Sequence, residues 1–455
     1  MYSILRFILM LCVSSVCCAS NTFLLTDTNP NSPEFRARFF GSYGINSAIE
    51  PTLTQVERPL YESIAPHLKD NPEKAIQLAL KGINSKSNAA FDFLIGSLYY
   101  SQQDYEQAKR YLLEAIEKFP DFRRAHRNLS LIYVLQQDYA AAIPHLLNVI
   151  KLGGGDDQSY SMLGYSYLNE EQYQSALSAY HNARMFAPDS KDIRRGEAQC
   201  LLVLQQLDAA IALFDELITE NPEEQDYWLL QANAYLAQQR LEDAIANLEI
   251  AHIIAPSSWE THKLLADLYT NKNMPIYALQ NYKASITANP NVAAKKAFQP
   301  LRQLVERGLY IEAADYLNHL EITLKSPLDA DQQLEKQVFS AKLEIKTGDP
   351  TNGVRQLEEV LETNPLNADA LLALADYQFE AENYEEAAFY FERAQSIPEA
   401  QIQALVGLAR TNVQQSRFTE AISYLEQAQS FEPRKDIERF LVSIQNALKA
   451  QNSRD

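Results

Sequence analysis

The stretch LGYSYLNEEQYQSALSAYHNARMFAP, from Leu163 to Pro188, decides the fold. It carries a glycine and a tyrosine three residues apart, then alanines at helical spacing, and it ends in a proline. Its first alanine recurs at a constant step along the chain: Ala108, Ala142, Ala176, Ala210, Ala244 and Ala278. The same step from Pro188 meets Pro120, Gly154, Pro222, Pro256 and Pro290. A register that holds without an insertion predicts a repeat architecture.

The tyrosine of the motif follows the same register. It recurs as Tyr99, Tyr133, Tyr167, Tyr235 and Tyr269, with Leu201 in the remaining place. Six contiguous units therefore fill residues 89–292, and three more fill residues 334–435. Residues 293–333 form a degenerate unit and hinge that keeps Ala313 but lacks the glycine and the tyrosine. Pro300 lies within the first helix expected there, and we expect it to kink that helix.

The residue types at these positions explain why the spacing matters. Small residues such as Gly164 and Ala176 let two helix axes approach closely, and Tyr167 and Tyr180 fill the space beyond them. Pro188 cannot continue a helix interior, so each unit ends there. Each hairpin has more than one apolar face and needs a neighbour on both sides. The sequence therefore predicts an all-α stack of helical hairpins.

These positions resemble the tetratricopeptide repeat, a helix-turn-helix unit of about 34 residues. The match in one unit comprises Leu163, Gly164, Tyr167, Ala176, Tyr180, Ala183 and Pro188. The resemblance implies an α-solenoid, a right-handed superhelix of helix-turn-helix repeats, and a protein-binding role. Capping helices are expected at residues 60–88, where Asn71 precedes Pro72, and a capping helix and tail at residues 436–455.

Residues 1–20 read as a signal peptide. Arg6 precedes an apolar run from Phe7 to Val16, and small residues follow it. The run is too short for a bilayer span, so we expect a protein exported across the inner membrane, most simply to the periplasm. A lipid anchor at Cys17 or Cys18 stays open as an alternative.

Residues 21–59 contain no repeat and form an N-terminal linker or partner segment. Its stretch RARFFGSYGINSAIEP, residues 36–51, has too many aromatic residues for a linker. It either packs against the first helices or binds a partner. Together with the signal and the repeats, this stretch resembles bacterial periplasmic repeat proteins associated with TonB-type transport clusters. That resemblance implies a partner among envelope transport components.

Composition excludes several classes of function. The formal charge of −19 argues against nucleic-acid binding and against docking on anionic lipid. No two of the seven histidines stand three or four residues apart, so no helix face presents paired metal ligands. The sequence GGGDD at Gly153 lacks the lysine of a phosphate loop and reads as a loop. We therefore expect no enzyme activity, no cofactor and no metal.

One pattern indicates a binding site. The fifth residue of each first helix is expected to line the concave groove, and in alternate units it is Arg127, Arg195 and Lys263. Arg123 and Arg124 precede the first of these. The alternative is local pairing on the same helix, of Arg195 with Asp192 and of Lys263 with Glu260. If the groove is the site, these basic residues receive a carboxylate-bearing segment, along a path lined by Tyr165, Gln199 and Asn233.

The sequence thus favours a non-catalytic scaffold for protein–protein interaction in the cell envelope. The alternative is a periplasmic scaffold for polysaccharide export or assembly, in which exposed aromatic residues such as Tyr100 and Tyr165 would contact sugar. This alternative hypothesis accounts less well for the basic residues at the predicted groove positions.

Overall fold

A computed structural model describes residues 50–452 of the chain. The predicted signal at 1–20 and the predicted partner segment up to residue 49 lie outside the described residues. Within residues 50–452 every regular element is a helix, and no strand occurs. The chain divides into two compact units, Met1–Ala255 and Pro256–Asp455.

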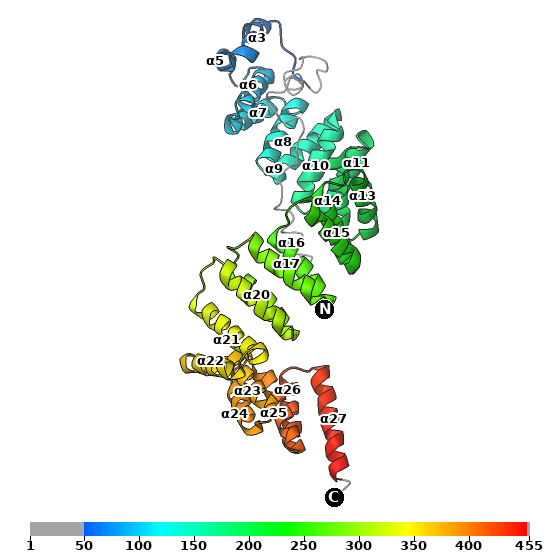
Figure 1. The fold of residues 1–455 in the computed structure, drawn as a ribbon. Coiled ribbons are helices and arrows are strands. Elements are labelled where there is room, and N and C mark those ends of the chain that lie inside the picture. Colours follow the sequence, from blue (N-terminus) through cyan, green and yellow to red (C-terminus); the bar gives the residue numbers. More distant parts are fainter. Residues whose placement is uncertain (1–49, 453–455) are drawn as a thin grey trace. The chain divides into compact units, whose positions relative to one another are not determined.

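The first unit holds a capping group followed by five hairpins (Figure 1). Its helices are α3 (Arg58–Ile64), α4 (His67–Asp70), α5 (Pro72–Gly82), α6 (Ala89–Ser101), α7 (Tyr105–Lys118), α8 (Arg123–Leu135), α9 (Tyr139–Val149), the π-helical turn η1 (Ile150–Gly154), α10 (Asp157–Asn169), α11 (Tyr173–Phe186), α12 (Lys191–Val203), α13 (Leu207–Glu220), α14 (Gln225–Ala237) and α15 (Leu241–Ile254).

The second unit continues the same pattern and ends in a long helix. Its helices are α16 (Trp259–Asn271), α17 (Pro275–Ala288), α18 (Ala294–Ala297), α19 (Gln299–Glu306), α20 (Tyr310–Thr323), α21 (Ala330–Thr347), α22 (Pro350–Thr363), α23 (Ala368–Glu380), α24 (Tyr384–Gln395), α25 (Gln401–Gln414), α26 (Phe418–Phe431) and α27 (Lys435–Asn452).

Helices pack in chain order within each unit. The two helices of a hairpin pack on each other, as α6 does on α7, and the second helix packs on the first helix of the next hairpin, as α7 does on α8. The predicted all-α fold of stacked helix-turn-helix repeats is therefore confirmed. The domain boundaries predicted from the sequence remain predictions.

The turn inside each hairpin closes on the backbone carbonyl of the residue that is usually the recurring tyrosine. Gln103 has a left-handed φ of 63°, its N–H donates to the carbonyl of Tyr100, and the N–H of Asp104 donates to the carbonyl of Tyr99. This double closure of a helix end is the Schellman motif. The left-handed residue returns in the same register as the repeat, at Gln103, Gln137, Glu171, Gln205, Gln239 and Asn273.

A buried tyrosine ring explains the glycine at position 164. Tyr180 on α11 is 1% exposed and lies between two glycines. A Cβ at Gly164 would stand 3.0 Å from its ring, and a Cβ at Gly196 would stand 2.3 Å from it. The second distance leaves no room for any side chain. The predicted close approach at Gly164 is thus present, and Gly196 of the next hairpin shares it.

The degenerate segment differs from the expectation of one kinked helix. The chain forms two short helices there, α18 and α19, separated by Phe298. Pro300 stands in the first turn of α19, where a proline displaces no hydrogen bond of the helix interior. It therefore begins a new helix and does not bend an existing one.

Candidate binding site

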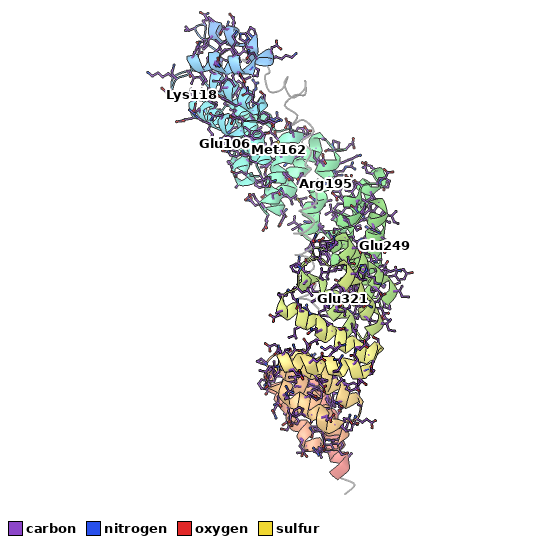
Figure 2. The ribbon with its side chains drawn as sticks, turned by 60° about the vertical axis from the view of Figure 1, so that its left-hand side comes forward. Glu106, Lys118, Met162, Arg195, Glu249 and Glu321 are labelled. Carbon is purple, nitrogen blue, oxygen red and sulfur yellow. The ribbon has the colours of Figure 1, made fainter. Side chains whose placement is uncertain are left out.

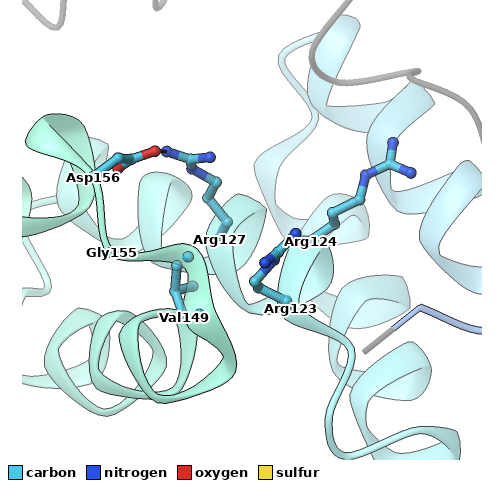
Figure 3. Close-up of a pocket in the computed structure, with 8 residues that line it drawn as sticks. Arg123, Arg124, Arg127, Val149, Gly155 and Asp156 are labelled. Atoms are coloured by element: carbon cyan, nitrogen blue, oxygen red, sulfur yellow. Dashed lines mark hydrogen bonds and ion pairs between the residues drawn. The ribbon is translucent and has the colours of Figure 1, made fainter. Parts of the chain in front are cut away.

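A cavity of about 260 Å³ lies in the first unit, between the start of α8 and the loop that joins α9 to α10 (Figure 3). We call it the arginine pocket. Its lining residues are Arg123, Arg124, Arg127, Val149, Gly153, Gly154, Gly155 and Asp156. The structure thus brings together three of the predicted site residues. A volume below that of most small-molecule sites suits one carboxylate-bearing side chain or chain end.

The start of α8 is fixed by aromatic packing. Phe122 stands at the N-cap position, is fully buried, and lies with its ring centroid 4.9 Å from that of Phe93. It offers no side-chain hydrogen bond to the helix, and the first turn of α8 carries no acidic residue. Arg123 and Arg124 therefore add their charge to the positive end of the helix dipole. This combination favours an anion.

The opposite wall consists of the three glycines that replace the closing proline of the repeat. The chain runs through the turn η1, and Gly153 takes a left-handed φ of 78°. A Cβ at Gly154 would lie 2.9 Å from Cδ of Arg123 and 2.9 Å from Cγ1 of Val149. Glycine is thus required for the close approach of Arg123. The predicted loop is present, and it begins with this π-helical turn.

Arg127 is held in place by the residues that start α10. Its guanidinium donates to the Asp156 carboxylate, and more weakly to Gln158 Oε1 at 3.4 Å and Ser159 Oγ at 3.5 Å. Asp156 is also the N-cap of α10, since its Oδ1 accepts from the Ser159 N–H at 2.7 Å. Burial acts to raise the pKa of Asp156, but Arg127 and the Ser159 hydrogen bonds hold it below its ordinary value. Asp156 is a site residue that sequence reasoning missed.

The other two arginines contact different groups. Arg123 Nη1 donates to the carbonyl of Leu152 at 3.4 Å. Arg124 points away from Asp156, lies over the ring of Phe93 at 5.0 Å, and stands 3.8 Å from a carboxylate oxygen of Glu50 (Figure 3). The pocket lining therefore holds three guanidiniums against the single carboxylate of Asp156. This local excess of positive charge contrasts with the net charge of −19 of the whole chain.

The remaining predicted residues lie outside this pocket. Tyr165 on α10 is half-buried, with its ring edge-on to Tyr139 at 5.5 Å. Arg195 lies on α12 (Figure 2). It stands 4.0 Å from Asp226 of the next hairpin, so its partner is not the predicted Asp192. Gln199 and Asn233 are half-buried on α12 and α14.

Lys263 belongs to the second unit. Its ammonium group forms an ion pair with Asp267 of the same helix at 2.7 Å. Pairing within the helix was the predicted alternative to a groove site, but the partner is Asp267 and not Glu260. Nothing in the structure relates Lys263 to the arginine pocket, which lies in the other unit.

Residues 50–452 contain no group of three or more side chains arranged to hold a metal ion. The same part of the chain includes no helix with the length and apolarity of a membrane span. Cys200 is fully buried, and burial raises the pKa of its thiol to about 12, which keeps it protonated and unreactive.

Several solved structures are similar to parts of the chain. MamA of Desulfovibrio magneticus RS-1, residues 41 to the end, has 18% identity and a TM-score of 0.35 over 36% of this chain and 93% of its own. YrrB, described as having an unusual peptide-binding site, has 20% identity and a TM-score of 0.38 over 45% and 98%. The repeat domain of P58(IPK) has 19% identity and a TM-score of 0.24 over 72% and 99%.

No curated protein matches the chain. Profiles of the tetratricopeptide repeat match residues 93–157, 167–234, 340–401 and 402–435. These segments make up half of the chain and coincide with the hairpins described above. The chain belongs to the tetratricopeptide repeat family.

Proposed function

We propose that this protein is a non-catalytic scaffold that holds an acidic segment of a partner protein, with the arginine pocket as its anchor. The observation that carries the proposal is that Arg123, Arg124 and Arg127 all line one small cavity of an otherwise acidic chain. Guanidinium groups recognise carboxylates through paired hydrogen bonds. The cavity is polar on its arginine side and bounded by backbone on its glycine side.

Export belongs to the same proposal. The signal-like residues 1–20 support secretion across the inner membrane, and we place the scaffold in the periplasm or on a lipid anchor there. The partner would then be an envelope protein, in the first instance a component of a TonB-type transport system. If none of the genes next to the gene for this protein encodes an envelope transport component, that partner is the wrong one.

A direct binding measurement tests the anchor. The probe is a fluorescent decapeptide of glutamate with a free C-terminal carboxylate, titrated against the purified protein and followed by anisotropy. We expect Arg127→Ala and Arg123→Ala each to weaken binding about tenfold, because each removes a charge-assisted hydrogen-bond donor. A glutamine decapeptide with an amidated end should not bind.

Arg240→Ala is the matched control. Arg240 lies in the same unit, pairs with Asp243 at 2.8 Å and stacks over Tyr235 at 4.4 Å, outside the pocket lining. If it weakens binding as much as Arg127→Ala, the peptide responds only to net charge and the proposal fails.

In-cell crosslinking tests the physiological occupant. A photoreactive residue at position 157, an exposed site next to Asp156, followed by mass spectrometry, should recover one protein with an acidic segment, and Arg127→Ala should abolish the crosslink. Recovery of glycan alone would instead support the polysaccharide-export scaffold.

A further inference from the structure

The ring of Phe186 is exposed at the end of α11, next to the arginine pocket. It is 58% exposed and stacks on the ring of Tyr160 from the start of α10, with the centroids 6.0 Å apart and the planes 19° apart. Tyr160 in turn lies against the pocket wall, because a Cβ at Gly155 would stand 3.0 Å from its Cε2 atom. The two stacked rings therefore continue the wall of the pocket beyond Gly155.

The side of α11 that carries Phe186 faces the preceding hairpin. Ala179 stands two helical turns earlier and lies on the same side of the helix. It belongs to the core cluster that includes Leu129 of α8 and Leu146 of α9. Phe186 is therefore on the side of α11 where α8 and its arginines lie.

The same two repeat positions hold an ion pair in other hairpins. One repeat later they are Arg194 and Glu220, which form two hydrogen bonds at 2.7 and 2.6 Å. Two repeats earlier they are Asp92 and Lys118, whose charged atoms stand 2.6 Å apart. The hairpin fold therefore does not require an aromatic pair at this contact. An exposed ring beside a polar cavity is instead typical of a binding surface, where aromatic side chains are enriched.

We infer that the stack of Tyr160 and Phe186 is an apolar subsite of the arginine pocket, and that the partner segment carries a large apolar side chain close to its anchoring carboxylate. The inference rests on the proposed function and narrows it to a segment that is both acidic and apolar. The guanidiniums of Arg123 and Arg127 attract the carboxylate, and the exposed face of Phe186 covers the apolar side chain. A purely acidic segment would leave that face in water.

The test compares glutamate decapeptides with and without one phenylalanine. Phenylalanine replaces glutamate at each position in turn, and anisotropy gives the affinity of each labelled peptide for the unaltered protein. At one or two positions the phenylalanine should tighten binding about tenfold over the all-glutamate peptide, because its ring becomes buried against Phe186. If no position tightens binding, the inference is wrong, and this holds whether or not any variant folds.

A pair of phenylalanine variants locates the gain. Phe186→Ala should remove most of it, so that the two kinds of peptide bind with similar affinity. Phe431→Ala is the matched control, because Phe431 ends α26 as Phe186 ends α11 and is 57% exposed, but belongs to the second unit. This control should leave the gain as it is in the parent. An equal loss in both variants would show apolar adhesion without a defined site and would overturn the inference.

The arginine pocket is tested separately with the same peptides. Arg127→Ala should weaken the phenylalanine peptide and the all-glutamate peptide by the same factor. If Arg127→Ala weakens both but phenylalanine brings no gain, the proposed function stands and only the inference fails. If Arg127→Ala weakens neither, while Phe186→Ala still removes a gain, the rings bind without the anchor, and the proposed function and the inference fail together.

The other occupant to be tested is a second copy of this chain. Sedimentation velocity over a wide range of protein concentration should give the same result for the parent and for Phe186→Ala. A dimer of the parent that Phe186→Ala dissociates would assign the rings to a contact between copies and would overturn the inference.

Discussion

His126 and His145 face each other across one hairpin, with their Nδ1 atoms 2.8 Å apart. Nε2 of His126 donates a hydrogen bond to the carbonyl of Pro120 at 2.9 Å. Nδ1 of His126 is therefore the acceptor, and Nδ1 of His145 donates a hydrogen bond to it. Tyr133 stacks on His145, and the carboxylate of Asp121 acts on His126 through its charge. Spacing along a single helix does not indicate this pair, because its members lie on α8 and α9.

The first prediction concerns the pH dependence of stability. Burial lowers the pKa of His126, and burial together with His126 lowers the pKa of His145 to about 4. Both folded values lie below the unfolded value of about 6.5, so the pair's contribution is complete above that pH and is lost as the pH falls toward 4. Urea unfolding between pH 7.5 and 4.5 should show this loss.

His145→Gln should flatten that profile, because a glutamine takes up no proton in this range. His252→Gln, at an exposed site on α15, is the control and should leave the slope as it is. A His145→Gln profile as steep as that of the parent protein would contradict the assignment.

The second prediction concerns the glycine wall of the pocket. Gly154→Ala places a methyl group 2.9 Å from Arg123 Cδ and 3.0 Å from the carbonyl oxygen of Val149. Arg123 must move away, so binding of the glutamate decapeptide should weaken about tenfold. Gly348→Ala in the second unit meets only the flexible end of Glu344, and it should bind as the parent does. Equal affinities for the two variants would exclude this role of Gly154.

The third prediction concerns the packing of Tyr180. Gly196→Ala puts a methyl group 2.3 Å from Cζ of that buried ring, which has no free direction to move. We expect the free energy of unfolding to fall by about 1–3 kcal/mol, the usual range for overpacking. Tyr180→Leu in the same chain should recover part of the loss. Chemical denaturation measures the stability of the single and the double variant. An unchanged midpoint for Gly196→Ala would show that the two hairpins can move apart at this contact without loss of stability.

The fourth prediction concerns the hairpin turns. Gln205 holds a left-handed φ of 62° in a Schellman closure, in which the N–H of Gln206 donates to the carbonyl of Leu201. Gln205→Gly relieves the steric strain of that conformation and should raise the free energy of unfolding by about 0.5–1 kcal/mol. Gln199→Gly, in the middle of α12, should lower it by about the same amount. A loss of stability in both variants would argue against strain at Gln205.

The sequence by itself determined the repeat and its helices. The position of Ala176 is alanine in all six contiguous units, and the position of Tyr180 always holds a large apolar residue. Every hairpin meets its neighbours in the same way, so local periodicity carries the fold. It also indicated the arginine pocket in part, because Arg123, Arg124 and Arg127 follow one another on a single helix.

Only the tertiary structure decided which residues complete the site. Asp156 pairs with Arg127 from the following hairpin, and Glu50 lies outside the repeats altogether, so no fixed spacing indicates either contact. The same holds for the approach of His145 to His126 across their hairpin. A repeat register fixes which positions face a neighbouring helix, but the ion pairs and hydrogen bonds that form there depend on the side chains of both partners. Those contacts follow from the packed chain and not from the period.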